Sequence, residues 1–116
     1  MLMAAFALQA AAQPSIPRKN GTTKTYKSSN RVWGTQYDWL SSRYATYDDI
    51  RYLDGGQVRV LKNSIYARLG RKFKDANLRA YFNSCSWYNG WRNEVPAREF
   101  NAYEKYNINF LKKYEQ

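Results

Sequence analysis

The chain has 116 residues, the length of a single small domain. Its 19 Lys and Arg against 9 Asp and Glu give a formal net charge of +10, yet a content of 44% hydrophobic and 17% aromatic residues is too high for a disordered protein. With no His and a single Cys, the chain cannot form the usual zinc ligand sets, an internal disulfide, or a catalytic triad with a His base.

An uncharged apolar run occupies residues 2–12 and ends in the small residues Ala10-Ala11-Ala12. The run is too short for a membrane-spanning helix, which needs about 20 apolar residues, so no transmembrane segment is expected. The pattern is typical of a secretory signal peptide, to which we assign residues 1–12. No basic residue precedes Arg18, which indicates a truncated signal whose translation start lies upstream. The alternative is a terminal helix that frays.

Residues 13–32 are predicted to form a flexible basic tail. They hold no acidic residue and half of the net charge, in the side chains of Arg18, Lys19, Lys24, Lys27 and Arg31. Because the segment has few apolar residues, it cannot bury enough surface to order itself. It is either a solvated linker or an electrostatic arm for an anionic surface.

Residues 33–116 are predicted to form a compact all-α domain of about four helices with an aromatic-rich core, opened by Trp33, Tyr37, Trp39 and Leu40. Thr46, with Asp49 three residues later, is predicted to cap a short first helix that Gly55-Gly56 ends. A second helix is expected over 57–69, where one apolar stripe runs through Val58, Leu61, Ile65 and Leu69. Gly70 follows at the position where a glycine with positive φ ends helices.

The third helix is predicted to start at the N-cap residue Asp75 and to bury Leu78, Phe82 and Cys85. On that stripe Cys85 is expected to be a buried, inert thiol, whereas an exposed sulfur would permit an intermolecular disulfide. A loop is expected over 86–95, and a last helix over 97–114. The inner side of that helix is predicted to carry Phe100, Tyr103, Asn107, Phe110, Leu111 and Tyr114, with Asn107 as a polar interruption.

The segment from Asn63 to Phe73 reads NSIYARLGRKF and resembles the core of the YARHG domain family, which is named for the pentad Tyr-Ala-Arg-His-Gly. Further matching elements occur in order over residues 39–114, namely Ser42–Thr46, Asp49-Ile50, Leu78, Tyr81-Phe82, Trp87-Tyr88 and the helix over 107–114. The His of the pentad is Leu69 here, so a role that needs an imidazole is absent and Leu69 is expected in the core. The family is bacterial and extracytoplasmic and has no established activity, so the resemblance implies a location and not a reaction.

Three residues in this motif, Asn63, Tyr66 and Arg68, are candidate binding residues on neighbouring helical turns. One interpretation is structural, because a Tyr hydroxyl and a guanidinium can satisfy the carbonyls at a helix end. The other is a polar patch in which Arg68 binds a carboxylate, phosphate or sugar and Tyr66 offers a stacking face.

Aromatic residues of the 86–95 loop are further candidates. Trp87 and Tyr88 are expected to cover the core between two helices. Trp91, between Gly90 and Arg92, is expected to be exposed. We therefore regard Trp91 and Arg92 as candidate binding residues for a sugar ring, a base or a peptide side chain.

The chain is not expected to be an enzyme, because it offers few groups for acid–base catalysis. Asp48 and Asp49 are adjacent and point to different helix faces, so they are not a cooperating pair. No Gly-rich phosphate loop, nucleophile motif or metal motif occurs, and no cofactor or metal is expected.

The favoured interpretation is a secreted, non-catalytic interaction module of the bacterial cell envelope that binds an anionic polymer or an acidic protein partner. The alternative is a small basic nucleic-acid-binding domain. Against this alternative, the basic residues are expected to be spread over several faces without a recognition-helix signature, namely Arg59, Lys62, Arg68, Arg71, Lys72, Lys74 and Arg79. A structural spacer, or an inhibitor of a partner enzyme, cannot be separated from the first interpretation by sequence.

Overall fold

The computed structural model describes residues 30–116, and the predicted signal peptide and residues 13–29 of the predicted tail lie outside them. The helices of the described part are α1 (Tyr47–Ile50), α2 (Gly55–Ala67), α3 (Ala76–Asn83) and α4 (Ala102–Lys112), with 3₁₀ helices at Asp38–Ser41 and Ala97–Glu99. Within it no strand forms, and the one β-type contact is an isolated bridge between Arg71 and Arg92. The predicted all-α class with four helices is therefore confirmed.

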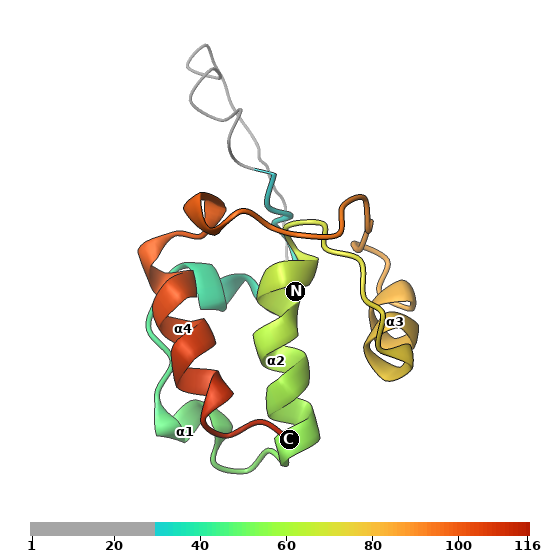
Figure 1. The fold of residues 1–116 in the computed structure, drawn as a ribbon. Coiled ribbons are helices and arrows are strands. Elements are labelled where there is room, and N and C mark those ends of the chain that lie inside the picture. Colours follow the sequence, from blue (N-terminus) through green and yellow to red (C-terminus); the bar gives the residue numbers. More distant parts are fainter. Residues whose placement is uncertain (1–29) are drawn as a thin grey trace. The chain divides into compact units, whose positions relative to one another are not determined.

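Helices α2 and α4 lie side by side at the centre of the domain (Figure 1). The 3₁₀ helix Asp38–Ser41 packs on α4, and α3 packs on α2. One cluster of buried side chains joins the elements around α2 and α4 and contains Tyr37, Leu40, Ile50, Val58, Ile65 and Leu111. A second cluster joins the end of α2 to α3 and contains Ala67, Phe73, Leu78 and Phe82. Tyr81 and Trp87 pack against both clusters, so aromatic rings connect the two halves of the core.

Two of the predicted N-caps are confirmed. Before α1, the Asp49 carboxylate accepts hydrogen bonds from the backbone N–H of Thr46 at 2.7 Å and from its hydroxyl at 3.2 Å. Before α3, the Asp75 side chain accepts from the backbone N–H of Leu78 at 3.0 Å. The first backbone N–H groups of a helix have no partner within the helix, so these side chains define where each helix begins.

The prediction that Gly55-Gly56 ends the first helix is wrong, because Gly55 is the first residue of α2. Asp54 accepts a hydrogen bond from the backbone N–H of Gln57 at 2.8 Å, and the Gln57 side chain accepts from the backbone N–H of Asp54 at 2.9 Å. This reciprocal capping box outweighs the low helix propensity of glycine. A Cβ at position 55 would lie 2.2 Å from the side chain of the exposed Gln116, which would have to move aside.

The predicted last helix over 97–114 is two elements. Phe100 is extended at ψ 135°, and α4 begins only after the N-cap residue Asn101. The Asn101 side chain accepts from the backbone N–H of Glu104 at 2.8 Å, and the Glu104 carboxylate accepts from the backbone N–H of Asn101 at 2.8 Å. This second capping box ends the predicted helix over 97–114 at Asn101 and starts a new one. The apolar periodicity continues across Asn101 and does not indicate the break.

The inner side of α4 also differs from the prediction. Leu111 is buried as expected, but Tyr103 and Tyr114 are exposed. The polar Asn107 lies on the inner side as predicted and is fully buried, where its side chain accepts from the backbone N–H of Ala45 at 2.8 Å and donates to two backbone carbonyls. Since those hydrogen bonds satisfy the amide completely, burial of Asn107 ties α4 to the segment before α1.

Gly70 has the predicted positive φ, at +89°, just after α2. The space beside it is also filled, because a Cβ there would lie 2.0 Å from the indole Nε1 of Trp91. Gly34 has a similar φ of +94°, but nothing lies within 4 Å of the place where its Cβ would be. Glycine is therefore required at position 70 by its backbone conformation and by its contact with Trp91.

Replacing Gly70 by Ala is expected to cost more stability than replacing Gly34 by Ala. Each substitution forces Ala into the left-handed region at about 1–2 kcal/mol, but only Gly70→Ala also drives a methyl group into Trp91. Urea unfolding followed by circular dichroism measures both losses. Equal losses would contradict the close packing of Trp91 on Gly70.

Acid should remove part of the stability that the start of α1 supplies. The hydrogen-bonded Arg43 guanidinium holds the pKa of Asp49 below its usual value. A lowered carboxyl pKa stabilises the folded state above the unfolded pKa of about 3.9, and this gain is lost as the pH falls through the folded value. The difference in unfolding free energy between the native chain and Asp49→Asn should therefore shrink below about pH 4. A difference that stays constant from pH 7 to pH 2 would contradict this ion pair.

Candidate functional site

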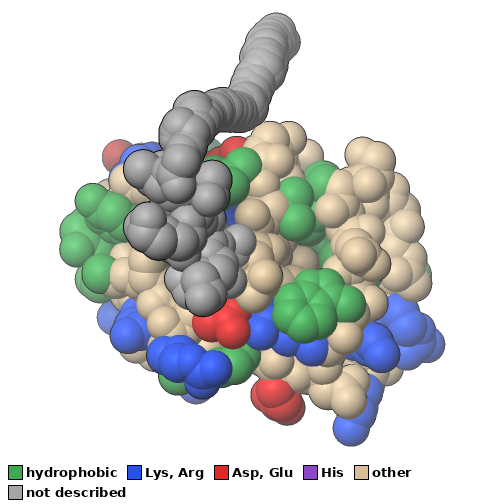
Figure 2. All heavy atoms as spheres, turned by 90° about the horizontal axis from the view of Figure 1, so that it is seen from above, with side chains coloured by type: hydrophobic (Ala, Val, Ile, Leu, Met, Phe, Trp, Pro, Cys, Tyr) green, Lys and Arg blue, Asp and Glu red, His purple; other side chains and the backbone are tan. Residues whose placement is uncertain are grey.

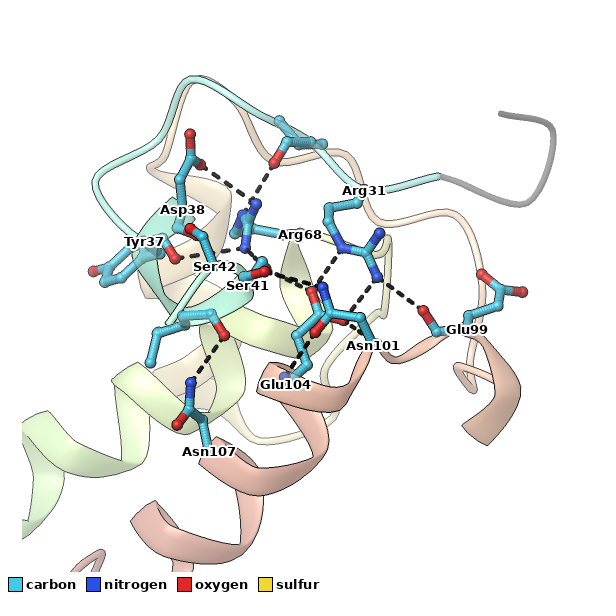
Figure 3. Close-up of polar contacts among 12 residues, drawn as sticks. Arg31, Tyr37, Asp38, Ser41, Ser42, Arg68, Glu99, Asn101, Glu104 and Asn107 are labelled. Carbon is cyan, nitrogen blue, oxygen red and sulfur yellow. Dashed lines mark hydrogen bonds and ion pairs between the residues drawn. The ribbon is translucent and has the colours of Figure 1, made fainter. Parts of the chain in front are cut away.

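The guanidinium of Arg68, at the end of α2, is fully buried (Figure 3). Its Nε donates to the backbone carbonyl of Val32 at 3.0 Å, and its Nη1 donates to the Ser41 hydroxyl at 2.5 Å. Its Nη2 lies 3.4 Å from the Asp38 carboxylate, and the Trp33 ring lies over the group with its centroid 4.9 Å away. All the partners therefore come from the segment 32–41, which Arg68 holds against the end of α2.

The same cluster continues to α4 through Ser41. The Ser41 hydroxyl donates to the buried Glu104 carboxylate at 2.5 Å, and Arg31 binds that carboxylate with Nε at 2.6 Å and Nη2 at 2.7 Å. We call these residues the buried network: Arg31, Asp38, Ser41, Arg68 and Glu104. Two arginines thus face two carboxylates, so the charges in the network balance.

Burial lowers the pKa of Arg68, while Asp38 and Glu104 act in the opposite direction. An arginine is so basic that it stays protonated even so, and the protein must therefore supply partners for a buried cation. Arg31 belongs to this network and to the folded unit that starts with it, although the sequence pattern places it in the basic tail.

The sequence-based candidates do not form one site. Arg68 is enclosed by protein, so the structural interpretation suits it and no face is open to a ligand. Asn63 is 6% exposed and donates to the backbone carbonyl of Arg59 at 2.9 Å. Tyr66 is half-buried with its ring edge against Phe100 at 5.2 Å, and burial raises its pKa.

Trp91 is 50% exposed, as predicted. Its neighbour Arg92 is engaged within the fold, because its guanidinium binds the Glu99 carboxylate at 2.6 and 2.9 Å and donates to the backbone carbonyl of Leu69 at 2.9 Å. The same guanidinium lies 4.3 Å from the Trp91 ring centroid. Arg92 therefore fixes the loop and supports the exposed Trp91 ring.

The remaining aromatic residues of the loop are packed as expected. Trp87 contacts both core clusters, and the Tyr88 hydroxyl donates to the backbone carbonyl of Arg71 at 2.6 Å. Leu69 is fully buried, which confirms its place in the core. Cys85 is predicted to be buried, but it is only half-buried. Its thiol lies 3.5 Å from the backbone carbonyl of Tyr81.

A basic cleft of about 780 Å³ lies between α2, the segment 71–75 and α3. Six cations line it, Arg59, Lys62, Arg71, Lys72, Lys74 and Arg79, together with Asn63 and Asn93 and the carboxylates of Asp75, Glu94 and Glu115. The sequence predicts that seven basic residues are spread over several faces. This prediction is wrong, because six of them line one cleft and the seventh, Arg68, is buried. The signal in the sequence was the spacing of Arg59, Lys62 and Asn63 along one helix face, followed by the basic segment after Gly70.

Ion pairs neutralise only part of the cleft. Arg59 lies 2.9 Å from Asp75, and Lys62 lies 2.9 Å from Glu115. Within residues 30–116, no carboxylate lies at ion-pair distance from the four other cations of the cleft, Arg71, Lys72, Lys74 and Arg79. The Arg79 guanidinium donates to the backbone carbonyl of Lys74 at 2.9 Å, which holds it against the segment that carries Lys72 and Lys74.

The local backbone directs two of these lysines outward. In the non-helical segment after Gly70, Phe73 is buried while Lys72 and Lys74 on either side are exposed. Alternating residues of an extended chain point to opposite sides, so both ammonium groups face solvent. Figure 2 shows Lys and Arg side chains gathered along one edge of the face it displays, with Asp or Glu side chains between them.

In the described part of the chain, no group of three His, Cys, Asp or Glu side chains is placed to hold a metal ion. None of the helices between residues 30 and 116 is long and apolar enough to cross a membrane.

Residues 34–116 match the family model of the YARHG domain. The chain therefore belongs to the YARHG domain family, which confirms the resemblance seen in the sequence around Tyr66, Ala67 and Arg68. Neither the curated proteins nor the solved structures include a significant match to the chain.

Replacing Arg68 by Ala should lower the free energy of unfolding by about 3–5 kcal/mol, since it removes the cation paired with Asp38 and the donor to the Val32 carbonyl and the Ser41 hydroxyl. Arg79→Ala, which removes an exposed guanidinium from α3, is the matched control and should stay within about 0.5 kcal/mol. Urea unfolding monitored by circular dichroism compares the two. Similar losses would contradict the structural role of Arg68.

If the Arg68→Ala variant does not fold, a milder substitution tests the same network. Ser41→Ala removes the hydroxyl that links Arg68 to Glu104. It should cost about 1–3 kcal/mol, because two buried polar groups lose a partner. A loss below about 0.5 kcal/mol would show that the link contributes nothing to stability.

Proposed function

We propose that this YARHG domain is a non-catalytic binding module of the bacterial cell envelope, and that its basic cleft takes an anionic polymer or an acidic protein segment. The observation that carries the proposal is the cluster of cations without carboxylate partners in that cleft. Within residues 30–116, eight Lys and Arg side chains have no carboxylate at ion-pair distance, and four of the eight line the cleft.

Electrostatics favours an anionic occupant of such a cleft. Cations grouped along a concave surface raise the local concentration of anions and speed their association. Lys72, Lys74 and Arg79 are exposed, so their charges are available without any rearrangement of the fold. Exposed charges are screened over about 8 Å at physiological salt, so binding through the cleft should weaken as salt is raised.

The location outside the cytoplasm is supported by two arguments that do not depend on each other. Residues 2–12 have the apolar pattern of a secretory signal peptide. Residues 34–116 belong to the YARHG domain family, and the resemblance to this family implies an extracytoplasmic location.

Two of the three carboxylates in the cleft, Asp75 and Glu115, are engaged in structural contacts, which favours binding over catalysis. Asp75 is the N-cap of α3 and pairs with Arg59, and Glu115 pairs with Lys62. The Arg59 pair and the backbone N–H of Leu78 hold the pKa of Asp75 below its usual value. A carboxylate that is ionised and occupied in this way is a poor general acid or base near neutral pH.

Removing two positive charges from the cleft should weaken binding to polyglutamate, an acidic polypeptide, or to polyphosphate by about tenfold or more at low salt. The test variant is Lys72→Ser with Lys74→Ser. The matched control is Lys105→Ser with Lys112→Ser, which removes the same charge from exposed positions of α4 that do not line the cleft.

Fluorescence anisotropy with labelled polyglutamate or polyphosphate, over a salt series, measures the effect. Equal losses in the two double variants would show that net charge alone attracts the polyanion and would overturn the proposed site. Tighter binding of duplex DNA than of either polyanion at physiological salt, lost in the Lys72 and Lys74 variant, would favour the nucleic-acid alternative.

A further inference from the structure

A continuous row of aromatic rings runs along α4 and includes rings from α1, from the segment before α1 and from the end of the chain. We call this row the aromatic ridge, and it contains Tyr44, Tyr47, Tyr103, Tyr106, Phe110 and Tyr114. Its five tyrosines are between 37% and 57% exposed. Adjacent ring centroids lie between 4.8 and 6.2 Å apart, so each ring contacts the next.

The ridge is not a by-product of core packing. Its members on α4 are spaced three or four residues apart, which places them on one side of the helix. The side of α4 that faces the core instead holds Glu104, Asn107 and Leu111, all fully buried. The helix therefore buries two polar residues and exposes an aromatic stripe, the reverse of the usual arrangement. Apart from Phe110, which also packs against the core, the ridge residues belong to neither core cluster, so their exposed rings are available for a partner.

The charges beside the ridge indicate the sign of that partner. The acidic residues of α1 are paired, Asp49 with Arg43 at 2.9 Å and Asp48 with Arg51 at 3.2 Å. Lys113 lies 5.8 Å from the Phe110 ring centroid and has no carboxylate at ion-pair distance within residues 30–116. The unpaired charge at the ridge is thus positive, and a second copy of a chain with a net charge of +10 would be repelled.

The side chains of the ridge indicate the chemistry of the partner. Protein partners usually insert a large side chain into a pocket, and none of the ridge residues lines the basic cleft or the apolar hollow beside Tyr37 and Tyr81. The ridge instead offers separate rings that are mostly tilted against one another, and five of them carry a hydroxyl group, which suits the successive polar units of a long chain. The C–H groups on the face of a sugar ring pack on the electron-rich aromatic face, while its hydroxyls and carboxylates remain free for tyrosine hydroxyls and for Lys113.

We propose that the aromatic ridge is a binding surface for an acidic polysaccharide, whose sugar rings stack on the tyrosines and whose carboxylates meet Lys113. The choice of a polysaccharide over a nucleic acid rests on the extracytoplasmic location given under the proposed function. The ridge itself shares no residue with the basic cleft.

The test uses the 116-residue chain and alginate, a polymer of sugar carboxylates, in isothermal titration calorimetry. Tyr106 contacts both Tyr44 and Phe110, so Tyr106→Ala interrupts the ridge at its middle. The matched control is Tyr52→Ala, because Tyr52, at 87%, is the most exposed tyrosine among residues 30–116 and lies outside the ridge. Tyr106→Ala should weaken alginate binding by about tenfold, and Tyr52→Ala should leave it unchanged.

The salt dependence separates the ridge from the cleft. In about 0.5 M salt the screening length falls to a few ångström, so the contribution of exposed charges should fade while ring stacking persists. The tenfold effect of Tyr106→Ala should therefore remain in the presence of Lys72→Ser and Lys74→Ser. If only the cleft proposal fails, Tyr106→Ala still weakens alginate binding tenfold. If the ridge proposal fails, Tyr106→Ala no longer weakens alginate binding.

Four results would overturn the ridge proposal. They are no binding of alginate by the native chain, equal binding by Tyr106→Ala, a dimer of the native chain in sedimentation that Tyr106→Ala dissociates, and Tyr106-dependent binding of oligothymidine without binding of alginate. Tyr44→Ser provides a second interruption of the ridge, because Tyr44 contacts both Tyr103 and Tyr106. A folding defect in one variant therefore does not decide the outcome. Circular dichroism confirms that each variant is folded before it is titrated.

Discussion

The burial of one guanidinium organises this domain. Arg68 lies at the end of α2 with no exposed surface, and a buried cation is tolerated only where hydrogen bonds and counter-charges replace water. Its partners come from the segment 32–41, and through Ser41 it reaches Glu104 at the start of α4. Three parts of the chain that are distant in sequence are therefore held together by one polar cluster, beside two modest apolar clusters.

The carboxylates and the cations of this domain have different roles. All nine carboxylates lie in the described part of the chain, and seven of them are in ion pairs. Asp54 is the N-cap of α2, which leaves Glu94 at the edge of the cleft. The fold thus uses its negative charge for internal structure, and the positive surplus faces outward. Four cations of this surplus line the basic cleft, which we propose binds an anionic partner.

Local signals in the sequence were enough for much of the helix layout. Thr46, Asp75 and Gly70 act through hydrogen bonds and backbone angles set within a few residues, so their roles could be read directly. The break at Asn101 was missed because the apolar spacing continues across it, and the start at Gly55 was missed because glycine propensity favours a helix end. The place of Arg31 and the cleft depend on contacts between distant residues, such as Arg31 with Glu104, which periodicity does not encode.

The central claim is that Arg68 holds the fold together while other cations meet the partner. The most direct test is nitrogen-15 NMR of the arginine side chains, recorded with and without a saturating amount of polyglutamate. The account predicts a slowly exchanging Arg68 Nε–H signal that does not shift on titration, while the Arg71 and Arg79 signals move. An Arg68 signal that exchanges rapidly with water and shifts with the polyanion would show an accessible binding residue and would contradict the account.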